Sequence, residues 1–418
     1  MTDNGNAIVR NPHRWVVFSV ISLVYFFVYF HRVSTSVIAQ DILIAFDTNA
    51  TALGFMSSMY FYLYALEQPL VGYYTDVLGG RRVIAYFTLA AALGCFMFAL
   101  APTMAWASAG RALIGIGVGG VYVPAIKAFS QWFRSNEFAT IMGLLVAAGN
   151  LGAIVATTPL AWAADNWGWR MSFAVIGFIS IALALMVLFF MKDFKAKEIP
   201  GEIHHKPRGA DPLKALFFKP LGSPQFWIIG MTFFGAYGIV MTFQGLWATP
   251  YLMAVLKIDR IVASNLNMII PIGFIIGAPL FGWFTDRLYK SKVRVIKFLL
   301  GILTITWSGI VFDVDLQVIG MSTILFFMGV TMGGITSLLW AHVRDITSPA
   351  TIGTFSGLIN PAPFLGVAVF QVLTGSLLDR ASLVSGAYPA EAYESSFILC
   401  FVTSCACLLL SFCLKEER

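Results

Sequence analysis

The sequence predicts an all-α membrane protein with twelve transmembrane helices arranged as two six-helix halves. First, 58% of the residues are hydrophobic and only 11% are charged, whereas about 25% of the residues of a soluble domain are charged. Second, apolar runs of roughly 20 residues recur along the chain, and each is long enough to span a bilayer. Third, one short signature follows the second apolar run of each half. Because the hydrocarbon core offers the backbone no water, we expect these runs to be helical.

The predicted spans are joined by short polar connections, except at residues 193–222. This long break contains several lysines together with histidine, proline and glycine, and we interpret it as a basic cytoplasmic linker. It separates an N-terminal six-helix bundle, residues 1–192, from a C-terminal six-helix bundle, residues 223–418. The predicted spans cover residues 15–40, 52–75, 83–101, 105–128, 138–162, 170–191, 225–252, 262–284, 295–312, 318–341, 352–376 and 393–414.

Lysine and arginine are concentrated in one of two alternating sets of connections, which includes Arg14, Arg134 and Arg344. The other set carries mainly acidic residues, such as Asp41 and Asp165. Because positively charged connections stay in the cytoplasm, we expect both termini and the linker there, in a bacterial inner membrane. The basic residues thus explain the net charge of +6 without a nucleic-acid partner. The polar start of the chain and the long first apolar run predict no cleavable signal peptide.

Arg32 lies inside the first predicted span. A guanidinium cannot lose its proton in a protein, and a charge at membrane depth is costly unless it faces a wet cavity or an anion. At helical spacing Arg32 shares one face with Tyr25, Tyr29 and Ser36. We interpret this face as an anion-binding site in a transport path. The alternative is an arginine that extends to the membrane surface or pairs structurally with an acid.

Glu67 is a second ionisable residue at membrane depth. It precedes Asp76 by nine residues, which places it about 13 Å deeper along a helix, on a face shared with Tyr60 and Tyr64. Burial disfavours the charged form of a carboxyl, which suits a group that takes up and releases a proton. We therefore hypothesise that Glu67 couples transport to protons; the alternative is a structural ion pair with Arg32. Both hold together if an anion competes with that ion pair.

Two further cationic candidates lie in the first half. His31 belongs to a residue type that changes charge near physiological pH, so it is a candidate proton site or substrate donor, or else a packed neighbour of Arg32. Lys127 lies near the cytoplasmic end of the fourth span, where it either attracts anions or extends to the membrane surface. Side chains that offer neutral hydrogen bonds from the second half are Gln244, Trp247, Tyr251 and Asn360.

The signature that follows the second span is GYYTD, then GGRR, in the first half and GWFTDR in the second. Charges at helix ends that pair in one state and separate in another bias a two-state equilibrium. We therefore expect conformational latches here, and we expect a structural or gating role for Arg111 in the fourth span. The expected latch residues are Asp76, Arg81, Arg82, Asp286 and Arg287.

These motifs resemble those of the major facilitator superfamily. The GYYTD and GGRR stretch is similar to its loop between helices two and three, and Arg111 with Gly115 and Gly119 is similar to its Arg-x-x-x-Gly motif. Together with the twelve spans and the internal repeat, the resemblance covers the whole chain. It implies the major facilitator fold, in which two pseudo-symmetric six-helix bundles rock around a central cavity.

Two groups of the superfamily are most similar in pattern, namely the organophosphate/phosphate antiporters and the anion:cation symporters of sugar acids. Trp15 and Arg32 reproduce the antiporters' tryptophan and anion-binding arginine, which are seventeen positions apart. The antiporters carry a second arginine on helix seven, whereas residues 231–251 contain no basic residue. The symporters carry acids where this chain has His31 and Val118. The missing arginine argues against a phosphoester substrate. The acids that carry protons in the symporters are absent from their usual positions.

We predict a secondary transporter of a small organic anion, with a carboxylate held by Arg32 and with proton symport. One fixed cation favours a monoanion. A rival is proton-driven export of an amphiphilic compound such as a drug or a siderophore, and a third hypothesis is a transporter-like ligand sensor. The sequence contains no phosphate-binding glycine loop, nucleophile motif or metal-ligand spacing, so we expect neither an enzyme, a cofactor nor a bound metal. The resemblance implies a monomer.

Overall fold

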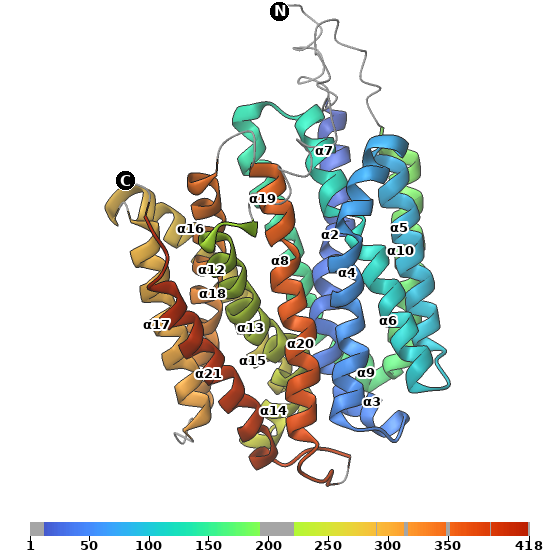
Figure 1. Ribbon diagram of the computed structural model, residues 1–418. Helices are drawn as coiled ribbons and strands as arrows, with labels where there is room; N and C mark the ends of the chain where they lie inside the picture. The colour runs from blue at the N-terminus through green and yellow to red at the C-terminus, as the bar shows by residue number, and fades with distance from the viewer. Residues whose placement is uncertain are drawn as a thin grey trace, which may run out of the picture.

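The computed structural model describes residues 12–192, 221–289, 291–312, 317–347, 352–384 and 386–416. These residues form helices joined by short connections, and within them the only β-structure is an isolated bridge between Val384 and Ala387. The helices form two bundles, coloured blue to green and yellow-green to red in Figure 1. The all-α fold prediction is confirmed. The predicted linker, residues 193–222, lies outside the described residues except for its last two.

The helices of the N-terminal bundle follow the predicted spans in order. They are α2 (His13–Val37), α3 (Ala39–Ala45), α4 (Ala50–Leu78), α5 (Gly80–Ala99), α6 (Met104–Gly119), α7 (Tyr122–Trp132), α8 (Ser135–Val155), α9 (Thr158–Trp167) and α10 (Trp169–Phe190). Pairs such as α6 and α7, or α8 and α9, together make one span, because each pair is interrupted by only two residues.

The C-terminal bundle repeats this plan, and its first span contains two π-helical segments, η1 and η2. Its elements are α12 (Pro224–Thr232), η1 (Phe233–Tyr237), α13 (Gly238–Thr242), η2 (Phe243–Trp247), α14 (Ala248–Leu256), α15 (Arg260–Asn267), α16 (Ile269–Phe284), η3 (Thr285–Tyr289), α17 (Lys292–Val311), α18 (Val318–Ile346), α19 (Ile352–Ile359), α20 (Pro361–Leu378), η4 (Ala390–Tyr393) and α21 (Glu394–Ser411).

Within the described residues, 11 helical segments are long and apolar enough to cross a membrane, and they match eleven of the predicted spans. The other predicted span, residues 52–75, is α4. With 29 residues, α4 is roughly 43 Å long, so its length suffices to span a bilayer. Its composition is less apolar because it contains five tyrosines as well as Glu67 and Gln68. Both Glu67 and Gln68 are buried inside the protein, which keeps their polar groups away from lipid.

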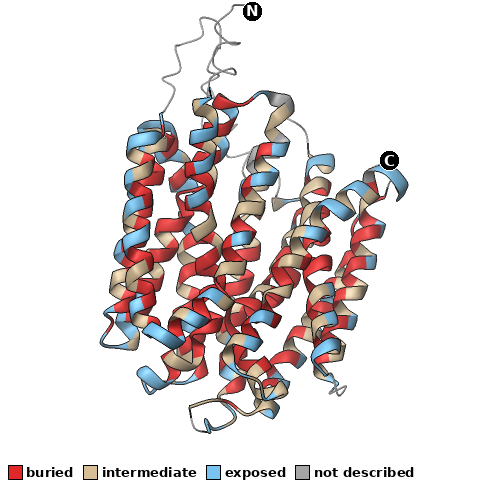
Figure 2. Cartoon of the chain, turned by 180° about the vertical axis from the view of Figure 1, so that it is seen from behind, coloured by how far each residue is buried: buried red, intermediate tan, exposed pale blue. Residues whose placement is uncertain are grey.

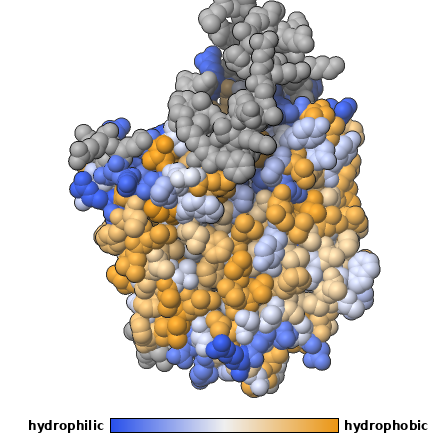
Figure 3. Space-filling model, viewed as in Figure 1, coloured by the Kyte–Doolittle hydropathy of each residue, from blue (hydrophilic) through white to orange (hydrophobic). Residues whose placement is uncertain are grey.

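The two ends of the molecule differ from its middle. We call the end at which α2 begins and α21 ends the terminal end, and the other, where α3, α9 and α14 lie, the opposite end (Figure 1). An apolar band crosses the visible face between two more polar ends (Figure 3). Buried residues line the inner faces of the helices, as Figure 2 shows. This distribution is that of a multi-pass membrane protein.

The packing between the bundles brings α2 to the centre of the molecule. Helix α4 packs along α20, α8 packs against α16, and α2 packs against η2. A Cβ added to Gly245 of η2 would lie 2.6 Å from the carbonyl oxygen of Arg32. Only a glycine therefore lets η2 approach the backbone of α2 this closely, and the approach sets Arg32 on the boundary between the two bundles.

Candidate functional site

Arg32 of α2 is buried at the boundary between the bundles, with 5% of its surface exposed. From the N-terminal bundle, the ring centres of Tyr29 and Tyr64 lie 4.3 Å and 5.3 Å from its guanidinium carbon. From the C-terminal bundle, the ring centre of Phe364 lies 5.1 Å away. The hydroxyl of Tyr237 accepts a hydrogen bond of 3.4 Å from Nη1. Arg32 thus lies in an aromatic cage to which both bundles contribute, and cation–π contacts stabilise its charge there.

A small central cavity of about 20 Å³ adjoins Arg32. This volume is enough for about one water molecule, so the site is closed around the cation in this conformation. Its polar lining includes the side-chain amides of Asn150 and Gln244, which come from opposite bundles. The residues that line the cavity are Tyr29, Arg32, Val33, Asn150, Ala153, Tyr237, Met241, Gln244, Pro271 and Phe274.

No acid in the described part of the chain neutralises the charge of Arg32. Among the described residues, the ion pairs do not include Arg32, and its Nε has no hydrogen-bond partner. An unpaired buried cation with a free donor is a strong site for a carboxylate or another oxyanion, because charge-assisted hydrogen bonds gain strength away from water. The site therefore has the charge and the donors to hold an anion between the bundles.

The two π segments place side chains of the C-terminal bundle at this cavity. Tyr237 is the last residue of η1, and Gln244 lies in η2. A π turn contains an extra residue, which shifts the faces of the helix that follows, and such turns are frequent at functional sites. The backbone carbonyl of Gln244 accepts a hydrogen bond of 3.1 Å from Nδ2 of Asn267, which holds η2 against α15.

Glu67 lies in α4 about one helical turn from Tyr64, towards the terminal end, and is 8% exposed. Its Oε1 is buried without a hydrogen-bond partner. The carboxyl packs against the backbone of α6, because a Cβ added to Gly119 would lie 1.6 Å from Oε1. Among the described residues, Glu67 and Arg32 form no ion pair. An unpaired buried carboxyl of this kind is strongly disfavoured in its charged form.

Gly119 supplies the space for this carboxyl, so Gly119→Ala is expected to displace Glu67 and to destabilise the protein by about 1–3 kcal/mol through overpacking. Thermal unfolding of the purified variants measures the effect. Gly143→Ala is the matched control, because a Cβ at Gly143 meets nothing within 4 Å. Adding Glu67→Ala to Gly119→Ala is expected to recover much of the loss, and an unrelieved loss would contradict this contact.

His31 and Arg111 point into the N-terminal bundle and not into the central cavity. His31 is completely buried, with Nε2 3.8 Å from Sγ of Cys95. Arg111 is also completely buried, and its Nη2 donates a hydrogen bond of 3.0 Å to the carbonyl oxygen of His31. Its guanidinium carbon lies 5.2 Å from the ring centre of Tyr60. In this conformation both residues pack against α2 on its side away from the central cavity. Their predicted roles in transport remain predictions.

Tyr25 extends the aromatic lining that begins at Tyr29. The two ring centres are 5.4 Å apart, and the ring of Tyr25 stacks on that of Tyr122 at 5.7 Å. Because α2 begins at the terminal end, this row of rings leads from Arg32 towards that end. The predicted shared face of Tyr25, Tyr29 and Arg32 thus corresponds to a continuous row of contacts.

The expected latch residues lie at the terminal end. Nζ of Lys127 is 2.6 Å from Oδ1 of Asp76, and this ion pair joins α7 to α4 inside the N-terminal bundle. Lys127 does not line the central cavity in this conformation. Arg81 donates a hydrogen bond to a backbone carbonyl of α10, also within the N-terminal bundle. Arg82 and Arg287 are exposed, and the side chain of Asp286 lies outside the described residues.

Three predicted residues of the second half do not line the central cavity beside Arg32. Nε1 of Trp247 donates a hydrogen bond of 2.8 Å to Oγ1 of Thr374, so Trp247 is a buried packing residue in this conformation. Tyr251 lies one turn further along the same span, towards the opposite end. Asn360 is half-buried at the junction of α19 and α20. Of the four predicted residues of this half, Gln244 alone lines the central cavity.

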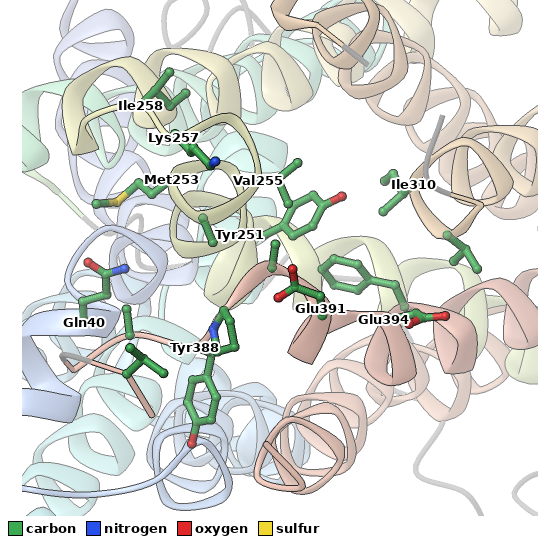
Figure 4. A pocket seen from close by; sticks show the side chains of 17 residues that line it. Gln40, Tyr251, Met253, Val255, Lys257, Ile258, Ile310, Tyr388, Glu391 and Glu394 are labelled. Carbon is green, nitrogen blue, oxygen red and sulfur yellow. The ribbon is translucent and has the colours of Figure 1, made fainter. Parts of the chain in front are cut away.

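Tyr251 instead lines a larger cleft of about 840 Å³ at the opposite end (Figure 4). Lys257 contributes one positive charge to its wall, whereas Glu391 and Glu394 contribute two negative charges. This balance of charge does not favour an anion, so the cleft is not the site that Arg32 predicts.

Sequence reasoning missed several residues of the cage and the cavity. Tyr237, Phe364 and Asn150 contact Arg32 or share its cavity, but they follow it in the chain by more than a hundred residues. Asn150 carried a usable signal, since an amide within an apolar run calls for a partner or a cavity. Nothing local in the sequence marks Phe364.

A family model described as Major Facilitator Superfamily matches residues 21–371. A protein named a probable sulfoacetate transporter of Cupriavidus necator is 25% identical over 409 residues, with 90% of this chain and 92% of that protein covered. A hexuronate transporter of Escherichia coli K12 is 24% identical over 392 residues, with 88% of each chain covered. A hexuronate transporter of Bacillus subtilis is 24% identical over 382 residues, which cover 86% of this chain and 87% of that protein.

Solved structures share the fold. A bacterial homologue of the human lysosomal transporter Spinster, in an inward-facing and unoccupied conformation, superposes with a TM-score of 0.74 at 18% identity, covering 96% of this chain and 97% of that chain. A D-xylose–proton symporter superposes with a TM-score of 0.75 at 14% identity, covering 96% and 98% of the two chains.

Proposed function

The chain belongs to the Major Facilitator Superfamily, and on that premise we propose that it is a secondary transporter that carries a small organic anion through the boundary between its two bundles. The observation that carries this proposal is Arg32, a buried cation that both bundles enclose and that no carboxylate of the described residues neutralises. A substrate anion that binds Arg32 contacts both bundles at once, so its binding is linked to their relative movement.

The relatives named for sulfoacetate and hexuronate carry organic acids, which supports a substrate with a carboxylate or a comparable oxyanion. One guanidinium presents the donors for one such group, so a monoanionic carboxylate is the expected substrate. Asn150 and Gln244 offer neutral hydrogen bonds beside it, which suits a molecule with further hydroxyl or carbonyl groups.

Proton symport is the proposed coupling, and Glu67 is its proposed proton carrier. Its carboxyl is buried and unpaired, as a group that is to bind a proton within the membrane should be. The excess of lysine and arginine at the terminal end supports a cytoplasmic location of that end in a bacterial inner membrane. Uptake into the cytoplasm by a monomer is the mode that we propose.

Uptake into proteoliposomes tests this function. Purified protein is reconstituted, and labelled galacturonate, a monoanionic carboxylate, is supplied outside with and without an inward proton gradient. Transport of an organic acid that the gradient accelerates is expected. If the proton gradient drives amphiphilic cations in the direction opposite to the protons, and organic acids are not transported, the rival hypothesis of proton-driven export would replace this one.

A further inference from the structure

The bundles are joined by charges at the opposite end. Arg260, the first residue of α15, donates from Nη1 and Nη2 to the two carboxylate oxygens of Asp41 of α3, at 2.7 Å and 2.8 Å. The same Nη1 lies 3.3 Å from Oδ1 of Asp165 in α9. An arginine of the C-terminal bundle thus binds two acids of the N-terminal bundle. One of these pairs has the bidentate geometry that makes such contacts strong.

A second contact across the boundary has the reverse polarity. Asp379, at the end of α20, accepts hydrogen bonds of 2.8 Å from the backbone N–H groups of Ala50 and Thr51, at the start of α4. The hydroxyls of Thr51 and Tyr388 donate to the same carboxylate. Burial opposes its charge, but these hydrogen bonds outweigh burial and lower the pKa of Asp379. A charged carboxylate at a helix N-terminus is favourable, so α20 is anchored to α4.

Small residues bring the two backbones together beside this anchor. A Cβ added to Gly54 of α4 would lie 2.2 Å from the carbonyl oxygen of Gln371, and one added to Gly375 of α20 would lie 2.4 Å from that of Ala50. Helices α4 and α20 are therefore in backbone contact at the opposite end, and no water-filled passage separates them there.

The ion pairs of the terminal end have a different character. Arg14 pairs with Glu137 inside the N-terminal bundle, and Lys292 pairs with Asp345 inside the C-terminal bundle. These pairs stabilise each bundle and leave the boundary between the bundles unaffected. Among the described residues, the ion pairs that join the two bundles thus lie at the opposite end.

Two buried amide side chains with unpaired polar atoms lie between the opposite end and the central cavity. Gln371 is completely buried, and neither its Nε2 nor its Oε1 has a hydrogen-bond partner. Asn267 is also completely buried, and its Oδ1 has none. Its Nδ2 donates to the carbonyl of Gln244, which connects it to the central cavity. Groups without a partner in the protein are costly to leave dry, so these two amides suit positions that water reaches in another state.

We propose that the Arg260–Asp41–Asp165 cluster and the Asp379–α4 contact form a two-part lock, and that Gln371 and Asn267 line the route from the opposite end to Arg32 once this lock opens. Rocking of the bundles separates both parts together, because each part joins one bundle to the other. Water then reaches the two amides, whose polar atoms gain the partners that they lack in the closed state. This inference does not depend on the identity of the substrate, nor on Arg32 being its ligand.

The accessibility of Gln371 tests the lock. Gln371→Cys is introduced into the otherwise intact chain, a water-soluble maleimide is added to purified protein, and mass spectrometry identifies each labelled cysteine. Arg260→Gln and Asp379→Asn, alone and together, open the lock with little change of shape. Lys292→Gln is the matched control, because it breaks an ion pair inside one bundle. The native thiols Cys95 and Cys400 are buried within single bundles and report on general loosening.

We expect the labelling rate at Gln371→Cys to rise at least about tenfold in the double lock variant, because each charge-assisted contact shifts a two-state equilibrium by roughly that factor. The Lys292→Gln control is expected to leave the rate unchanged, and Cys95 and Cys400 are expected to stay protected. An unchanged rate at Gln371→Cys would overturn the proposal. So would equal labelling of Cys95 and Cys400, because the lock residues would then stabilise the bundles themselves.

Discussion

Replacing Arg32 with alanine is expected to abolish measurable binding of the organic anion. The guanidinium is the cation of the central cavity, and its aromatic cage has no second charge to offer an anion. Losing one partner of a buried charge pair costs about 2–5 kcal/mol, or roughly a 30-fold to 4,000-fold loss of affinity. Equilibrium binding of galacturonate, a monoanionic carboxylate, to the purified variant measures this loss.

Two variants control this experiment. Arg32→Lys keeps the charge without the planar fork of donors and is expected to bind with intermediate affinity. Arg14→Ala removes an arginine that pairs with Glu137 outside the cavity, and it is expected to bind like the unmodified protein. Binding by Arg32→Ala within about threefold of the original affinity, well under the 1.4 kcal/mol of a tenfold change, would show that Arg32 serves the structure and not the substrate.

Glu67→Gln is expected to uncouple transport from protons. Glutamine has the shape and hydrogen-bonding reach of a protonated glutamate but cannot release a proton. Because Oε1 of Glu67 is buried and unpaired, the substitution leaves no described partner unsatisfied. Accumulation driven by an inward proton gradient should therefore fall to the level seen without a gradient. Exchange of labelled for unlabelled substrate, which needs no net proton movement, should persist.

His31→Gln is the matched control for the proton experiment. His31 lies inside the N-terminal bundle beside Cys95 and does not line the central cavity, so this variant should retain gradient-driven uptake. Proton dependence that survives unaltered in Glu67→Gln would end the hypothesis for Glu67. Loss of that dependence in His31→Gln instead would assign the proton site to the histidine.

Most of the fold was predictable because the bilayer leaves few alternatives. A backbone in hydrocarbon must satisfy its own hydrogen bonds, so each long apolar run predicts a helix. Helix α4 was predicted in spite of its tyrosines and Glu67 because a long, mainly apolar segment outweighs a few polar residues that face inwards. The break between α6 and α7 was not predicted, since it depends on packing between neighbouring helices.

The candidate site was predictable only in part. Arg32 is conspicuous as a charge inside an apolar run, and Tyr29 lies at helical spacing from it. Tyr237 was missed because it lies 205 residues from Arg32 in the sequence. The prediction for Trp247 and Tyr251 rested on the hydrogen-bonding atoms that they offer, and it did not include the two π segments of this span, η1 and η2. Each π segment shifts the faces of the helix, so Gln244 reaches the cavity while Trp247 is packed against Thr374.

The central claim is that the protein binds an organic anion through Arg32. A thermal-shift screen of the purified protein against organic acids, sugar phosphates, amino acids and amphiphilic cations, repeated on Arg32→Ala, tests it most directly. We predict stabilisation by one class of organic acid, and we predict that this stabilisation disappears in the variant. Stabilisation by cations or bulky neutral compounds that is indifferent to the substitution would contradict the claim and would favour the exporter hypothesis.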